Sequence, residues 1–151
     1  MTGGLNLRKY SIGAFFTLSA ALSTVIGLSV CLMNVRGGWL ALTAVHSIVV
    51  RCLSIAAALE MLALLIGMRG APSFADLFPV AASALLTFGA ATLLIARLEI
   101  LIPIFAGGAS ENGALALDGS AVRCLLEIGF CLAAVISAIL GAFFDVTVEA
   151  E

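Results

Sequence analysis

Residues 11–33 read SIGAFFTLSAALSTVIGLSVCLM, a run of about 23 residues without one charged side chain. At 1.5 Å per residue, a helix of this length crosses the roughly 30 Å hydrocarbon core of a bilayer. The run is too long for the apolar region of a signal peptide, and no A-x-A cleavage site follows it. We therefore interpret it as a retained first transmembrane span.

Three more apolar runs follow, and polar or breaker-rich segments separate them. The turn at 34–38 contains two glycines, the segment 69–76 contains Gly70 and Pro72, and the segment 107–120 is polar and small in its side chains. The sequence predicts an all-α polytopic membrane protein, a four-transmembrane-helix antiparallel bundle that forms a single domain over residues 1–151. The expected spans are 11–33, 39–68, 77–104 and 121–144.

Composition agrees with a membrane location and excludes one function class. Apolar residues make up 63% of the chain and charged residues 11%, and the mean hydropathy is +1.24. An ordinary soluble domain contains roughly 25% charged residues, so lipid is the expected surrounding. The net charge of −2 leaves no basic excess to neutralise phosphates, which argues against nucleic-acid binding.

The distribution of basic residues predicts an orientation. Arg8 and Lys9 precede the first span and Arg69 lies in the second loop, whereas Arg36 lies in the first loop and Arg123 at the rim of the fourth span. Because loops rich in Lys and Arg stay on the cytoplasmic side, we expect both termini on the cytoplasmic (or matrix or stromal) face.

Small residues recur at every fourth position in the first and fourth spans. Helices in lipid associate by close approach through such residues, and a four-residue spacing drifts by about 40° per step. The rows indicate either tight packing within the bundle or a groove for another subunit. The residues are Ser19, Ser23 and Gly27 in the first span, and Gly129, Ala133, Ser137 and Gly141 in the fourth.

Seven ionisable side chains fall inside the predicted spans, where each buried charge costs at least about 2.5 to 3.5 kcal/mol near the bilayer centre. Six of them are expected in one layer, in which Arg123 pairs with Glu127 along a helix or Arg51 pairs with Glu127 across helices. An internal ion-pair network, a polar pathway or ligand site, and pairing with a neighbouring protein remain open. The six are His46, Arg51, Arg97, Glu99, Arg123 and Glu127.

Glu60 is expected to stand apart from this layer. It lies about 12 Å from the face that holds the termini, and no basic residue is near its level. A lone carboxyl at this depth is expected to keep its proton, because desolvation disfavours the charged form. A structural carboxyl bonded to a backbone carbonyl and a proton- or cation-binding site are both consistent with the sequence.

The sequence contains no glycine-rich phosphate loop, HExxH motif, nucleophile elbow or metal-ligand cluster, and its single histidine cannot form a bis-histidine haem site within one chain. The four cysteines lack CxxC spacing and lie in apolar runs, where cysteine packs as a small hydrophobe. The four-span layout and the tripeptide Ala96, Arg97 and Leu98 look like the MAPEG family of membrane glutathione transferases and eicosanoid synthases. That family's second span carries Arg, Asn, Glu and Pro, whereas residues 51–60 read RCLSIAAALE without Asn or Pro, so the resemblance is rejected.

These observations favour a small integral membrane subunit with a structural or assembly role. Such a chain packs against partner subunits in a membrane complex, its partners being the lipid bilayer and other membrane chains. The alternative is a homo-oligomeric channel or transporter for ions, protons or small solutes, which uses the intramembrane charges. An internal repeat, typical of many transporters, is not found.

Overall fold

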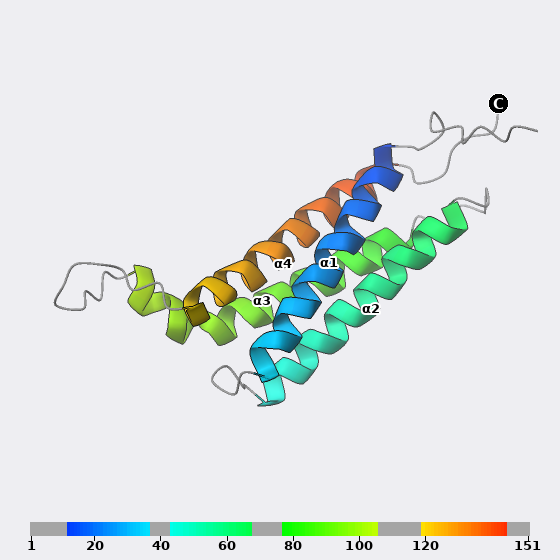
Figure 1. Cartoon of the computed structure of the whole chain (residues 1–151). Helices are drawn as coiled ribbons and strands as arrows, with labels where there is room; N and C mark the ends of the chain where they lie inside the picture. Colours follow the sequence, from blue (N-terminus) through cyan, green and yellow to red (C-terminus); the bar gives the residue numbers. More distant parts are fainter. Residues whose placement is uncertain (1–11, 37–42, 68–76, 106–118, 145–151) are drawn as a thin grey trace, which may run out of the picture.

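The computed structural model describes residues 12–36, 43–67, 77–105 and 119–144, and these residues are helical apart from the bend at Phe144 (Figure 1). Four helices result, and no strand occurs in these ranges. They are α1 (Ile12–Arg36), α2 (Thr43–Gly67), α3 (Leu77–Phe105) and α4 (Gly119–Phe143).

Each helix contains a segment long and apolar enough to cross a membrane, which confirms the predicted all-α four-span fold. The segments are Ile12–Asn34, Ser47–Gly67, Leu77–Leu98 and Val122–Phe143. Several helix ends differ from the prediction by a few residues: α3 ends at Phe105, and α4 runs from Gly119 to Phe143. Asn34 belongs to α1 and not to the following turn, since the helix continues to Arg36. Residues 39–42 of the second predicted span lie outside the described residues.

The helices form a four-membered ring in which each packs on the two that are adjacent. α1 contacts α2 and α4, α3 contacts the same two helices, and the contact between α1 and α4 is the most extensive. α1 and α4 run antiparallel, because Ser19 meets Ser137 while Asn34, near the other end of α1, meets Glu127. Figure 1 shows the chain passing up and down through the four helices in order.

Buried positions follow a seven-residue pattern, with alternating steps of four and three residues. This average spacing of 3.5 is typical of helices that cross at about +20° with left-handed supercoiling. In α1 the pattern runs through Gly13, Thr17, Ala20, Thr24, Gly27, Cys31 and Asn34. In α2 it runs through Val49, Leu53, Ala56, Glu60 and Ala63. We call each such row the seam of its helix.

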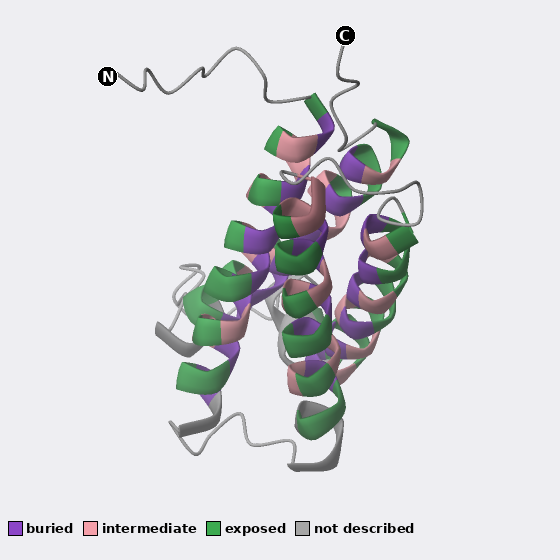
Figure 2. Ribbon diagram, turned by 90° about the vertical axis from the view of Figure 1, so that its right-hand side faces the viewer, coloured by how far each residue is buried: buried purple, intermediate pink, exposed green. Residues whose placement is uncertain are grey.

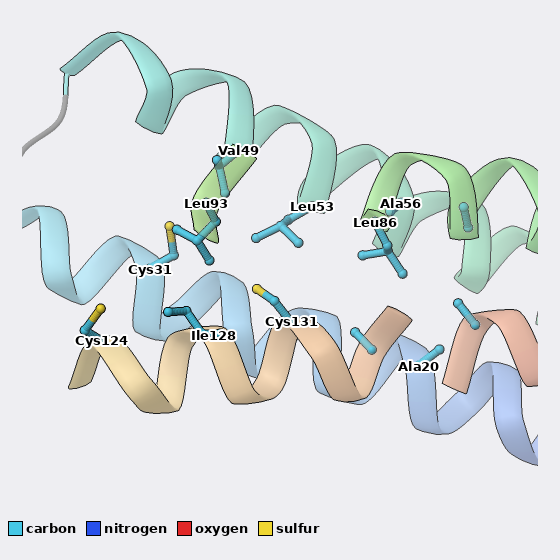
Figure 3. Close-up of a cluster of buried hydrophobic side chains, with 13 residues drawn as sticks. Ala20, Cys31, Val49, Leu53, Ala56, Leu86, Leu93, Cys124, Ile128 and Cys131 are labelled. Atoms are coloured by element: carbon cyan, nitrogen blue, oxygen red, sulfur yellow. The ribbon is translucent and has the colours of Figure 1, made fainter. Parts of the chain in front are cut away.

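Exposed residues follow the outer sides of the helices (Figure 2), and small side chains fill much of the core together with a few leucines such as Leu53 and Leu86 (Figure 3). Alanines and cysteines such as Ala20, Cys31 and Ala134 are fully buried, whereas Phe15 is 67% exposed and Phe143 is 81% exposed. Only 28–33% of each span is buried inside the bundle. Acyl chains are as apolar as leucine, so the outer phenylalanines face lipid while small core residues let the helices approach closely.

Candidate functional site

The first buried polar cluster joins three helices through Glu127. Nη2 of Arg97 in α3 lies 3.2 Å from Oε2 of Glu127 in α4 and forms a salt bridge with it. Nδ2 of Asn34 in α1 donates a hydrogen bond of 2.8 Å to the same oxygen. Arg97 and Asn34 are each 3% exposed and Glu127 is completely buried. One carboxylate oxygen therefore holds α1, α3 and α4 together.

Geometry explains why these residues meet. Glu127 and Asn34 both occupy seam positions, and Arg97 follows Leu93 on the buried side of α3. A charge on the seam cannot reach water, so it needs an opposite charge and hydrogen bonds from neighbouring seams. Asn34 donates one of those bonds, and its Oδ1 remains without a hydrogen-bond partner among the described residues.

Three buried thiols surround the ion pair. Cys31, Cys124 and Cys131 lie close enough to Glu127 to interact with it electrostatically, and Figure 3 shows all three facing the core. They are free cysteines. Within the described part of the chain, no group of three or more His, Cys, Asp and Glu side chains is arranged to hold a metal ion. All three are buried in the bundle near the Glu127 carboxylate.

The structure brings together two of the six residues predicted to form the charged layer. Glu127 pairs with Arg97, and not with the expected partners Arg51 or Arg123, whose side chains are exposed on the outside of α2 and α4. Both arginines are expected at about the depth of the cluster along the bundle axis, but the rotation of their helices points them to the outside. The side chains of His46 and Glu99 lie outside the described residues.

Asn34 is the member of this cluster that the sequence analysis did not identify. Two glycines follow closely at 37 and 38, which favoured a turn at this position. A signal was nevertheless present, because Asn34 continues the seven-residue row of small and polar residues from Thr17 through Thr24 and Cys31. Alternating steps of four and three residues along α1 place Asn34 on the seam.

Glu60 forms a second polar cluster, separate from the first. It is 1% exposed, and its Oε2 lies 3.3 Å from the hydroxyl of Thr24 in α1. That hydroxyl also lies 2.8 Å from the carbonyl oxygen of Ala20. Oε1 of Glu60 has no hydrogen-bond partner among the described residues. The sequence found Glu60 as an isolated carboxyl but did not identify Thr24 as its neighbour.

The predicted small-residue rows divide between the interface and the outer surface. The hydroxyls of Ser19 and Ser137 lie 3.5 Å apart, Gly27 packs against Cys131, Gly141 packs against Thr17, and Ser23 is half-buried. Gly129 and Ala133 are exposed, and no neighbouring atom lies within 4 Å of the position of a Cβ on Gly129. Three steps of about 40° turn Gly129 roughly 120° away from Gly141, and this drift moves it off the interface.

No protein-family model matches the chain, and no curated protein or solved structure does so either.

Proposed function

We propose that this chain is a small integral membrane subunit that packs against partner chains through the outer face of α2. The observation that supports the proposal is the exposure of Arg51 inside the apolar segment Ser47–Gly67. Arg51 lies four residues from the start of that segment, or about 6 Å along the helix axis. The long side chain lowers the free-energy cost of placing the charge in the membrane by reaching toward the interface. A hydrogen-bonding neighbour would lower this cost further.

Among the described side chains, no carboxylate of the bundle is placed to fill this role, which leaves it to a neighbour. Glu127 is completely buried and already bonded to Arg97 and Asn34, so it offers nothing to Arg51 on the outer face. Ser54 and Ala58 are also exposed and continue from Arg51 in steps of three and four residues. This polar and small stripe, Arg51, Ser54 and Ala58, suits a partner helix with a carboxylate or an exposed carbonyl at the level of Arg51.

Site-specific photo-crosslinking in native membranes tests the proposal. A photoreactive amino acid at Ser54 should yield a defined protein adduct, because Ser54 lies one turn from Arg51 on the same stripe. The same amino acid at Ile95, which is 68% exposed on α3, is the matched control and should yield lipid adducts. Lipid adducts alone at both positions, or the same protein adduct at both, would contradict a specific contact at α2.

Substitution of Arg51 separates partner binding from folding. Arg51→Leu should reduce recovery of the crosslinked protein in mild-detergent pull-down, and Arg51→Lys should retain part of it because the charge remains. The detergent-solubilised chain should be as stable with Leu as with Arg, since the side chain is exposed in the bundle. Unchanged recovery with Arg51→Leu would remove the support for the proposal.

A second candidate function is a homo-oligomeric channel or transporter. It is favoured by the inward placement of Glu60, Arg97 and Glu127, which are at most 3% exposed and lie within the ring of helices. Intramembrane ionisable groups that face a bundle interior are a recurring feature of ion and proton pathways. Proteoliposomes with wild-type protein should then show ion or proton flux above empty vesicles, and Glu60→Gln should lower it. Wild-type flux at the empty-vesicle background would refute this function.

A further inference from the structure

The carboxyl of Glu60 occupies an apolar part of the core, remote from other charges. Its neighbours along the seam of α2 are the buried residues Ala56 and Ala63, and among the described residues it makes a polar contact with Thr24. On the two helices that contact α2, the described titratable or charged side chains are Cys31 on α1 and Arg97 on α3, and α4, across the ring, adds four more. Those four are Arg123, Cys124, Glu127 and Cys131.

None of these groups forms an ion pair with Glu60 in the described structure. Arg97 is bonded to Glu127, and Arg123 points to the outside of α4. Thr24 and Asn34 are ten residues apart on α1, or about 15 Å along the axis, so the Glu60 contact and the Glu127 contact are well separated. An ionised Glu60 would therefore be a buried carboxylate without a counter-charge, which is strongly unfavourable.

Hydrogen counting at Thr24 identifies where a proton is needed. The hydroxyl has one hydrogen and lies 2.8 Å from the Ala20 carbonyl, a better hydrogen-bond distance than the 3.3 Å to Glu60. If Thr24 donates its hydrogen to Ala20, no hydrogen lies between Thr24 Oγ1 and Glu60 Oε2 unless the carboxyl group itself carries one. A protonated Glu60 satisfies both contacts, since it donates to Thr24 Oγ1 while Thr24 donates to Ala20.

We propose that Glu60 and Thr24 form a proton-binding site inside the bundle, in which the hydroxyl of Thr24 reverses its hydrogen bond when the proton leaves. In the protonated state Glu60 donates to Thr24, and Thr24 donates to the carbonyl of Ala20. In the ionised state Thr24 turns its hydrogen to Oε2 of Glu60 and releases Ala20. The two hydrogen-bond patterns use the same three oxygens and differ in the orientation of one hydroxyl.

The ligand chemistry favours a proton over a metal cation. The site offers two carboxyl oxygens and one hydroxyl, and the hydroxyl is shared with Ala20. Oxygen-liganded cations such as Ca²⁺ or Mg²⁺ require six or more ligands. A proton bound to Glu60 requires only one hydrogen-bond acceptor, which is Thr24 Oγ1. This inference depends on the contacts of Glu60 alone and stands whether or not the chain has a partner subunit.

Infrared spectroscopy of the full-length protein in lipid nanodiscs tests the site. The wild-type spectrum at neutral pH should contain a carbonyl band of a protonated carboxylic acid, which Glu60→Gln removes. Glu127→Gln is the matched control and should leave the band in place, because the Glu127 carboxylate is paired with Arg97. Thr24→Val should shift the band to higher frequency by removing the hydrogen bond, and Thr24→Ser should restore its position.

Exchange of the proton is measured on the same samples. Transfer to D₂O should shift the band to lower frequency, which shows that the proton leaves and returns. A band that is absent at neutral pH, or that survives in Glu60→Gln, would overturn the proposal. So would a band that does not respond to D₂O or to Thr24→Val, because the first finding excludes exchange and the second excludes the contact with Thr24.

Labelling of the wild-type chain gives a result that does not depend on the folding of any variant. Apolar carbodiimides react with protonated carboxylic acids, adding across the carboxyl O–H to give an adduct that retains all atoms of both reactants. Peptide mass spectrometry after treatment in membranes should locate the adduct at Glu60 and not at Glu127. Labelling should decline as pH rises, and labelling at Glu127 with none at Glu60 would refute the proposed site.

Discussion

At the residue scale, Glu127 is the acceptor on which the charged cluster depends. Replacing it with alanine leaves Arg97, which is 3% exposed, without its counter-charge, and leaves Asn34 without its acceptor. We expect Glu127→Ala to lower the free energy of unfolding by about 3–5 kcal/mol, the usual cost of removing one partner of a buried ion pair. Reversible unfolding in mixed detergent micelles measures this loss.

Two controls accompany that prediction. Arg51→Ala, on the outer face, should change the free energy of unfolding of the isolated chain by no more than about 0.5 kcal/mol. The double variant Arg97→Met with Glu127→Leu should recover most of the lost stability, because apolar residues of similar volume often replace a buried pair without cost. Additive losses in the double variant would show that the two charges do not act as a pair.

At the element scale, the contact between α1 and α4 should respond to glycine substitutions according to the space at each site. A Cβ on Gly141 would lie 3.0 Å from Oγ1 and 3.3 Å from the backbone nitrogen of Thr17, and the nitrogen cannot move without α1. Gly141→Ala should therefore destabilise the bundle by about 1–3 kcal/mol, the typical cost of overpacking. Thermal unfolding in detergent measures the change.

Two other glycines of the same rows provide matched comparisons. Gly27→Ala should be nearly neutral, because its Cβ would meet Cys131 and Phe130 at ordinary contact distances of 3.4–3.7 Å. Gly129→Ala should stabilise the isolated chain by up to about 1 kcal/mol through helix propensity, since nothing lies within 4 Å. Equal effects at Gly129 and Gly141 would contradict the observed rotation of α4.

At the scale of the whole molecule, four antiparallel spans place both ends of the bundle's chain on one side of the membrane. α1 begins and α4 ends at the same end of the bundle, where the rings of Phe16 and Phe144 stack with centroids 5.9 Å apart. From the distribution of Lys and Arg we predict that this is the cytoplasmic side. A fluorescent protein fused after residue 151 should be fluorescent and located on the cytoplasmic side. A reporter fused after residue 105 should be located on the opposite side of the membrane. The reverse pattern would refute the orientation.

The sequence by itself determined the number, type and approximate bounds of the helices, because span length and hydrophobicity are local properties. A run such as residues 11–33 must become a helix in lipid, since backbone groups there find no other hydrogen-bond partners. It also identified Glu60 as an isolated carboxyl and Arg97 and Glu127 as charges that need partners. These conclusions required no knowledge of how the helices rotate.

Rotation about each helix axis was decided only by the tertiary structure. Arg51, Arg97 and Arg123 are all expected near the level of Glu127 along the helix axes. Of the three, packing turns Arg97 inward to Glu127, whereas Arg51 and Arg123 are exposed. The same choice places Gly141 against α1 and leaves Gly129 outside, although both belong to one row of small residues. The physical reason is that spacing along a helix fixes angles relative to that helix, whereas the face that is buried depends on how all four helices fit together.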